Sequence, residues 1–292
     1  MRNNIYVHAA LTLAAILHAL NYTIAKFVMS ETIGPFGLIV IRVTIALCLF
    51  WATSMVLPSE KIDKKDFGRI VLCAVLGASV NILFFFKGLA WTTPANASLI
   101  MTTTPILVII PALLLNTEKL NITKLVGLGF GLIGTLWLLS HQFQQINFNG
   151  LYGDLMVFGN ALFYAAYLVV MKPLLKKYQP ITLFKWLFLF GLVLVLPFGL
   201  DDIIHTSWTN TSLTGWLGLG FVAVCATFLT YLLNAWALKK VNPSLVGIYI
   251  YLQPLVATAI SVSLGDDTLN WQKIGVACLI FTGVFLVSKT KA

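Results

Sequence analysis

Residues 89–134 read LAWTTPANASLIMTTTPILVIIPALLLNTEKLNITKLVGLGFGLIG, and residues 238–283 read LKKVNPSLVGIYIYLQPLVATAISVSLGDDTLNWQKIGVACLIFTG. The two stretches align without a gap at a constant offset of 149. Leucine and glycine matches are expected by chance in so apolar a chain, whereas matches of proline, asparagine, lysine and acid are not. The informative pairs are Pro94/Pro243, Pro105/Pro254, Asn121/Asn270, Lys124/Lys273 and Glu118/Asp267. A weaker alignment at an offset of 146 pairs Lys26 with Lys172. The chain is therefore an internal duplication.

The composition predicts a membrane protein. Hydrophobic residues make up 59% of the chain and charged residues 10%, and the mean hydropathy is +0.91, whereas a soluble domain carries about 25% charged residues. Because backbone groups inside a bilayer must pair within the protein, apolar runs of about 17–25 residues are expected to be helices. The ten runs are 7–29, 34–57, 70–91, 95–115, 122–140, 154–171, 183–200, 216–238, 245–264 and 271–288. We therefore expect an all-α integral membrane protein with ten transmembrane helices.

The distribution of basic residues predicts the orientation. With the N-terminus inside, fifteen of the 19 Lys and Arg residues fall at the inner ends of the runs. This asymmetry places both termini in the cytoplasm by the positive-inside rule. It also accounts for the net charge of +9 without nucleic acid as a partner. The remaining four basic residues are Lys26, Arg42, Lys87 and Lys273.

The helix count predicts how the two halves are related. Five helices per half is an odd number, so the second repeat, 152–292, enters the membrane opposite to the first, 1–140, and the connector 141–152 divides them. Inverted repeats of this kind are typical of transporters whose site lies near the middle of the membrane. Pro105 and Pro254 lie within helices four and nine at equivalent positions. We expect each proline to bend its helix and to act in gating.

The motifs resemble the EamA-type branch of the drug/metabolite transporter superfamily over essentially the whole chain. The resemblance rests on the two repeat stretches quoted above, on LHALNYTIAK in the first helix and on IRV at 41–43. It implies transport of a small molecule, with amino-acid or related metabolite export as the leading class. One departure is Gly265-Asp266-Asp267, where the family usually has Gly-Glu. Glu118 and Asp267 precede spans and are expected to stabilise helix N-termini.

Polar and aromatic residues at helical spacing predict a central cavity. Such spacing places each set on one face, and polar groups in hydrocarbon must face inward to find partners. For a single Asn or Ser, an ordinary inter-helix hydrogen bond is the alternative interpretation, and His18 either titrates or bonds as a neutral group. The candidate substrate-binding residues are His18, Asn21, Tyr22, Asn81, Phe85, Ser98, Thr102, Asn160, Tyr164, Tyr167, Tyr231, Asn234, Tyr249 and Gln253.

Charged residues within the spans form a second group. Lys26, Arg42 and Lys87 lie toward the outer ends, where long side chains can reach the headgroups. As an alternative, one of the three attracts a substrate carboxylate, and Arg42 and Lys87 are the candidates for this outer charge. No carboxylate lies at mid-span, no nucleotide-binding loop is present, and no metal-ligand or nucleophile–base cluster is evident. We therefore expect no catalytic residue, no metal and no cofactor.

The sequence thus predicts a secondary transporter that exports a small organic metabolite by alternating access, without an obligate protein partner. Import or exchange of a nucleobase or sugar derivative stays open. A membrane enzyme acting on lipid is a further alternative, for which the outer residues Asp154, Asp201, Asp202 and His205 are the candidates; a solvated connector is the simpler interpretation of Asp201 and Asp202. Short loops and cytoplasmic termini are typical of bacterial proteins, so we expect the chain to lie in the lipid bilayer of the bacterial inner membrane.

Overall fold

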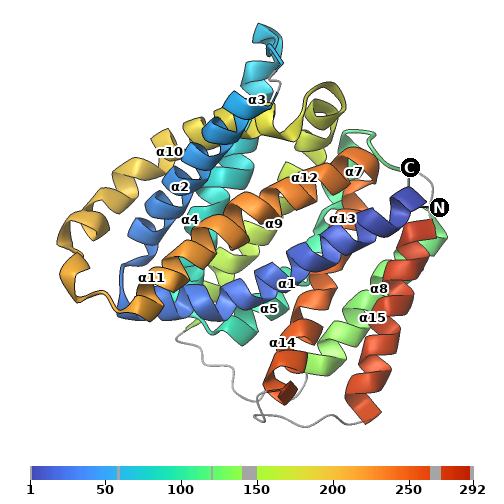
Figure 1. The fold of residues 1–292 in the computed structure, drawn as a ribbon. Coiled ribbons are helices and arrows are strands. Elements are labelled where there is room, and N and C mark those ends of the chain that lie inside the picture. The colour runs from blue at the N-terminus through green and yellow to red at the C-terminus, as the bar shows by residue number, and fades with distance from the viewer. Residues whose placement is uncertain (1, 58–59, 120, 140–149, 264–270, 290–292) are drawn as a thin grey trace.

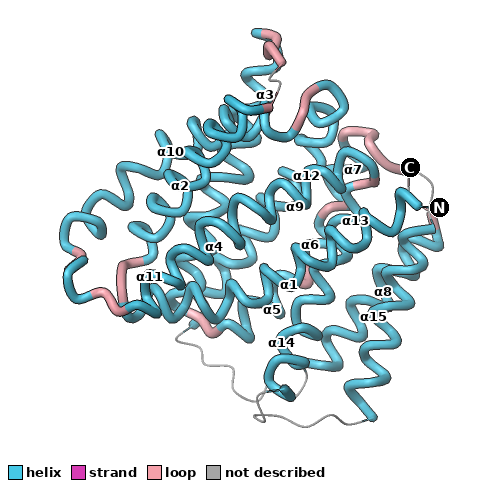
Figure 2. Tube along the Cα trace, viewed as in Figure 1, coloured by secondary structure: helices cyan, strands magenta, loops and turns pink. Residues whose placement is uncertain are grey.

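The computed structural model describes residues 2–57, 60–119, 121–139, 150–263 and 271–289, and these ranges are helical almost throughout, without a strand (Figures 1 and 2). Eight of the described helices, counted across their irregular turns, are long and apolar enough to cross a membrane. Two shorter apolar helices, Ile122–Trp137 and Ile274–Lys289, accompany them. An integral membrane protein with many spans follows from these lengths and compositions.

The two halves have the same order of elements as far as the helices that begin at Pro94 and Pro243. The first half comprises α1 (Arg2–Glu31), α2 (Pro35–Val56), η1 (Lys64–Asp66), α3 (Phe67–Ala74), η2 (Val75–Ser79), α4 (Val80–Trp91), α5 (Pro94–Met101), α6 (Thr104–Leu107), α7 (Ile109–Leu114) and α8 (Ile122–Leu139). The second half comprises α9 (Leu151–Lys177), α10 (Pro180–His205), η5 (Trp208–Asn210), α11 (Leu213–Gly220), η6 (Phe221–Leu229), α12 (Thr230–Lys240), α13 (Pro243–Ile248), η7 (Tyr249–Tyr251), α14 (Leu252–Ser263) and α15 (Trp271–Lys289). The orders differ beyond α5 and α13, where α6 and α7 follow in the first half, and η7 and α14 in the second.

Proline sets both the beginnings and the interruptions of these helices. Pro94 and Pro243 begin α5 and α13, because proline has the φ of a helix and the first turn needs no backbone N–H. Further along, Pro105 cannot donate to the carbonyl of Met101, and Pro254 cannot donate to that of Ile250. The helix breaks at these two points: α5 ends at Met101, and a 3₁₀ turn spans Tyr249–Tyr251. The expected distortion is therefore present in both halves.

A second pair of irregularities was not predicted. The apolar helix α3–η2–α4 contains the π-helical segment η2, and the apolar helix α11–η6–α12 contains the π-helical segment η6. The positions of η2 fall within η6 at the repeat offset of 149. Segments of this type redirect backbone carbonyls away from the regular ladder and often occur at functional sites.

Three long helix pairs organise the packing: α2 lies along α10, α4 along α9, and α8 along α15. Figure 1 shows the first pair on one side of the molecule and the third on the other, with α1 crossing between them. Glycine permits the closest approach. A Cβ on Gly283 would lie 2.5 Å from the Gly127 oxygen, and one on Gly153 would lie 2.8 Å from the Gly88 oxygen.

Asp201 and Asp202 were expected in a solvated connector, but in the structure α10 continues to His205. Asp201 and Asp202 therefore lie on the last turns of a helix and not in a loop. The Asp202 Oδ2 accepts hydrogen bonds from the backbone N–H groups of Phe36 (3.0 Å) and Gly37 (2.9 Å). The Asp202 carboxylate thus caps the N-terminus of α2, which explains why this charge ends an apolar helix.

Candidate functional site

A cavity with a volume of about 100 Å³ lies among helices from both halves of the chain. A cavity of this size holds several waters or a small organic molecule. Four of its walls come from α1, α4, α9 and α12, and the others from α2, α5 and the interrupted helix α13–η7–α14. The lining residues are Leu11, Ala14, Ala15, His18, Asn21, Tyr22, Arg42, Asn81, Ile82, Phe85, Phe86, Met101, Asn160, Tyr164, Tyr167, Tyr231, Asn234, Val246, Tyr249, Ile250 and Gln253.

Most of the candidate binding residues meet at this cavity. Their helical spacing placed each set on one face, and the fold turns those faces toward one another. Only two of the fourteen candidates do not line the cavity, namely Ser98 and Thr102. The twelve that do are His18, Asn21, Tyr22, Asn81, Phe85, Asn160, Tyr164, Tyr167, Tyr231, Asn234, Tyr249 and Gln253.

The helix break near Pro105 bears on one of the two exceptions, because Thr102 follows the last residue of α5. Thr102 is fully buried and its hydroxyl donates to the Leu99 carbonyl at 2.6 Å. Ser98 is also buried outside the lining. Met101, the last residue of α5, faces the cavity in their place. Helical spacing past Met101 does not apply to Thr102, because the regular helix ends there; Ser98 lies within the regular helix, and its spacing gives no reason for its place outside the lining.

Hydrogen bonds across the cavity wall join the two halves. The Tyr22 hydroxyl donates to Gln253 Oε1 at 2.9 Å. The side chains of Asn81 and Asn160 each donate to the backbone oxygen of the other, at 3.1 Å and 2.9 Å. These bonds give partners to the amide nitrogens of Asn81 on α4 and Asn160 on α9, which would otherwise be costly in a membrane.

The π-helical segments supply backbone acceptors to the same region. The Tyr231 hydroxyl donates to the Gly77 oxygen in η2. At the equivalent position of the other half, the Ala226 oxygen in η6 accepts a 3.5 Å contact from Arg42 Nη2. Both donors line the cavity, and both reach across to the opposite repeat. The irregular helices therefore help to position cavity side chains.

Arg42 differs from its expected place. The side chain was expected to reach the outer membrane boundary or an outer vestibule, but it is only 5% exposed and lines the central cavity. Its Nε donates to Thr227 Oγ1 at 2.8 Å, and its guanidinium carbon lies 4.6 Å from the centre of the Phe86 ring. Arg42 belongs to α2, and its contacts with Thr227 and Ala226 in the neighbouring segment η6 hold the side chain inside the protein.

Lys26 also differs from expectation, because it caps a helix instead of extending to the headgroups. Its Nζ donates to the oxygens of Leu89 (2.7 Å), Ala90 (2.7 Å) and Thr92 (2.9 Å) at the end of α4. Its repeat partner Lys172 donates to Leu238 and Val241 oxygens at 2.5 Å each, at the end of α12. Each ammonium satisfies unpaired carbonyls and offsets the helix dipole.

Lys87 keeps a peripheral position. Its Nζ lies 5.1 Å from the centre of the Phe36 ring and 4.6 Å from that of the Trp91 ring, both within cation–π range. It does not line the cavity. Trp91 is 52% exposed, which agrees with an aromatic residue at the end of a span.

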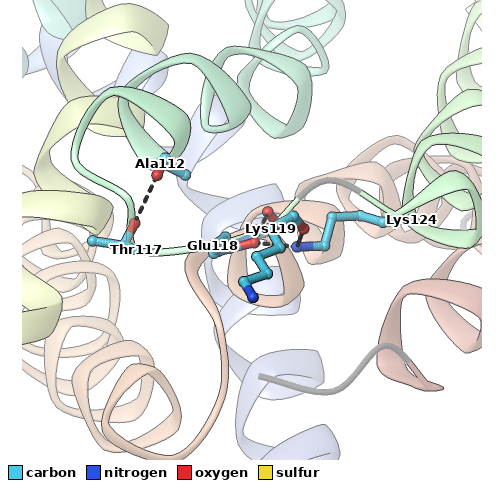
Figure 3. Close-up of polar contacts among 6 residues, drawn as sticks. Ala112, Thr117, Glu118, Lys119 and Lys124 are labelled. Carbon is cyan, nitrogen blue, oxygen red and sulfur yellow. Dashed lines mark hydrogen bonds and ion pairs between the residues drawn. The ribbon is translucent and has the colours of Figure 1, made fainter.

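Glu118 lies in the connector after α7, where Figure 3 shows its side chain beside Lys119 and Lys124. Its Oε1 accepts from the Ser244 N–H at 2.9 Å, and its Oε2 accepts from the Ser244 hydroxyl at 2.6 Å. It also forms a buried ion pair with Lys124. The carboxylate therefore caps the N-terminus of α13, not of the helix that follows it in sequence. Its repeat partner Asp267 lies outside the described residues.

Two residues missed by the sequence reasoning extend the site. His8 Nδ1 forms a hydrogen bond with the Tyr249 hydroxyl between α1 and η7. Phe86 supports Arg42 from the cavity wall. His8 continues the α1 stripe of Leu11, Ala15 and His18 at helical spacing, so its position was recoverable. The apolar lining residues carry no pattern that separates them from lipid-facing ones.

The acids considered for lipid chemistry have structural roles. Asp154 Oδ1 accepts from the Thr92 hydroxyl at 2.5 Å, and Asp202 caps α2 as described above. His205 Nδ1 lies 3.2 Å from the Asp201 carboxylate on the exposed end of α10. These residues do not line the cavity, so the geometry gives no support to a membrane enzyme.

The whole chain is similar to known transporters. The model of the EamA-like transporter family matches residues 6–140 and again 151–289. An uncharacterized transporter of Archaeoglobus fulgidus is 24% identical over 96% of this chain and 98% of its own length. The uncharacterized transporter YyaM of Bacillus subtilis is 26% identical over 77% of this chain and 74% of its own.

A solved structure shares the fold, with a TM-score of 0.74, 18% identity and coverage of 98% of this chain and 96% of that one. The double match of the family model, the all-helical membrane fold and the transporter relatives agree with one another. The chain belongs to the EamA-like transporter family, and its function is that of a transporter and not an enzyme.

Proposed function

We propose that the protein is a secondary transporter that carries a small organic metabolite, with an amino acid or a related compound as the exported substrate. In this proposal ten helices cross the inner membrane of a bacterial cell as two inverted five-helix repeats, at 1–140 and 152–292. Both termini face the cytoplasm. The observation that carries the proposal is the cavity, because its polar lining comes from equivalent helices of both halves.

The lining suits a molecule with both polar and apolar parts. Tyr164 and Tyr167 stack with ring centres 6.0 Å apart, and Tyr22 lies 5.6 Å from Phe85. Asn21, Asn234 and Gln253 add amides to these aromatic surfaces. Aromatic walls with a few placed polar groups are typical of small-molecule sites.

The interrupted helices provide the means of movement. A proline-distorted helix lacks one backbone bond and bends more easily than a regular one. Pro105 and Pro254 stand beside the cavity residues Met101 and Ile250. We infer that the two halves rock about the cavity while the helices interrupted near Pro105 and Pro254 alternately open each side, in the manner of alternating access.

Three single substitutions test the cavity. Asn21→Ala, Tyr164→Ala and Asn234→Ala each remove a lining side chain, and each is expected to reduce transport in proteoliposomes while the purified protein stays folded. Phe281→Ala is a matched control, because Phe281 is 59% exposed on α15 and does not line the cavity. Unchanged transport in all three cavity variants would remove this cavity as the site.

The orientation has its own test. Single cysteines at 2 and 289, in a variant whose four native cysteines are replaced by alanine, are expected to react with a membrane-impermeant maleimide only after the cells are opened. Labelling of intact cells at either position would overturn the cytoplasmic placement of that terminus.

A further inference from the structure

The cavity contains one cation and no carboxylate of its own. Among the lining residues, all of which belong to the described part of the chain, Arg42 is the one Lys or Arg side chain, and neither Asp nor Glu is present. An arginine within a membrane span normally has a partner of opposite charge or backbone carbonyl groups, because an unpaired buried charge is costly. The missing countercharge is therefore the feature that needs an explanation.

The contacts of Arg42 orient its guanidinium without neutralising it. Thr227 Oγ1 accepts from Nε at 2.8 Å, the Ala226 oxygen lies 3.5 Å from Nη2, and the Phe86 ring covers one face. All three partners are uncharged. An arginine has five N–H donors, and the contacts with Thr227 and Ala226 use Nε and Nη2. A fork held in this way matches the geometry of a carboxylate, which accepts two parallel hydrogen bonds.

Two acceptors with no protein donor lie on the same cavity. Asn21 Oδ1 and Asn160 Oδ1 are buried and have no hydrogen-bond partner among the described residues. A buried acceptor left in this state is unfavourable. Neutral amide oxygens can accept N–H groups from a ligand, including an ammonium, but they cannot neutralise a second cation in the cavity. The polar lining thus pairs one positive site with neutral acceptors.

We propose that Arg42 binds a carboxylate of the transported molecule and so restricts transport to organic carboxylates, zwitterionic ones included. This inference rests on the transport function proposed above. Its chemical consequence is the exclusion of compounds whose only charge is positive, since these would add a second cation beside Arg42 in a region of low dielectric. The aromatic surfaces of Tyr164, Tyr167 and Phe85 receive the apolar body of the same molecule.

A set of matched compounds tests the rule on the wild-type protein. L-phenylalanine, its amide and 2-phenylethylamine share an aromatic body, and leucine with its amide repeats the comparison for an aliphatic one. Counterflow in proteoliposomes is expected to favour each carboxylate over its amide or amine by roughly tenfold or more, as loss of a charged hydrogen-bond partner predicts. Equal transport of amide or amine and acid would overturn the proposal while leaving the transport function intact.

Substitutions locate the effect at Arg42. Arg42→Gln is expected to remove most of the preference for the acid over the amide, and Arg42→Lys to retain part of it. Lys185→Gln is the matched loss of charge away from the cavity, where Lys185 lies over the Trp51 ring at 5.4 Å, and should leave the preference unchanged. A full preference in Arg42→Gln would refute the role of Arg42.

A binding measurement keeps the proposal testable if Arg42→Gln does not fold. Phenylalanine or leucine should raise the unfolding temperature of the wild-type protein in detergent more than the matching amide does. An equal rise with both members of each pair would overturn the carboxylate rule. Absence of flux for every solute tested would instead refute the transport function on which the inference depends.

Discussion

Replacing Lys124 with methionine measures the contribution of the buried ion pair that holds α13. The side chains of Lys124 and Glu118 are 4% and 3% exposed, and Glu118 also accepts two hydrogen bonds from Ser244. Removing one partner leaves the other charge buried without compensation, which typically destabilises a protein by about 3–5 kcal/mol. We therefore expect Lys124→Met to lower the free energy of unfolding by about this amount.

The assay is unfolding by sodium dodecyl sulfate in mixed micelles, followed by the fluorescence of the eight tryptophans. Lys177→Met is the matched control: Lys177 pairs with Asp66 at 3.0 Å, but its side chain is 59% exposed. Solvent screens such a pair, so the control should shift the unfolding midpoint far less.

The double variant Glu118→Gln, Lys124→Met completes the test. It removes both charges and keeps an amide oxygen for Ser244, so most of the lost stability should return. The reasoning is refuted if Lys124→Met behaves like Lys177→Met, or if the double variant is as unstable as Lys124→Met alone.

Two further outcomes concern helix packing and capping. Gly283→Ala should destabilise the protein by about 1–3 kcal/mol, because the new methyl group would meet the Gly127 backbone oxygen and overpack the contact between α8 and α15. Gly275→Ala is the control on the same helix, since a methyl group there meets nothing within 4 Å. It should be neutral or stabilising in the same unfolding assay. Lys26→Met and Lys172→Met should each lower the unfolding midpoint, since each leaves carbonyl groups at a helix end without a donor, and unchanged midpoints for both would show that water or lipid replaces the ammonium.

The sequence was sufficient to predict features that depend on local chemistry. Helical length and apolarity follow from the solvent, and the beginnings at Pro94 and Pro243 follow from the fixed φ of proline. The shared faces of α1, α9 and α12 follow from the helical repeat. These features brought twelve of the fourteen cavity candidates to one place.

Features that depend on which helices pack together could not be derived in this way. The place of Arg42 in the cavity could not be read from its position on α2, because it depends on η6 and Phe86 packing against the side chain. The role of Asp202 as a cap also could not be derived, because its partner Gly37 at the N-terminus of α2 is 165 residues away in sequence. Thr102 lies outside the cavity lining, beyond Met101, where the regular spacing of α5 ends.

The most direct test of the account is counterflow in proteoliposomes that contain the purified wild-type protein. Vesicles preloaded in turn with unlabelled amino acids, nucleobases and sugars should accumulate the matching labelled solute, with and without a pH gradient. The account predicts accumulation of one class, amino acids or related carboxylates, and a smaller signal in Tyr164→Ala. Accumulation of none of these solutes, with correctly folded protein in sealed vesicles, would contradict it.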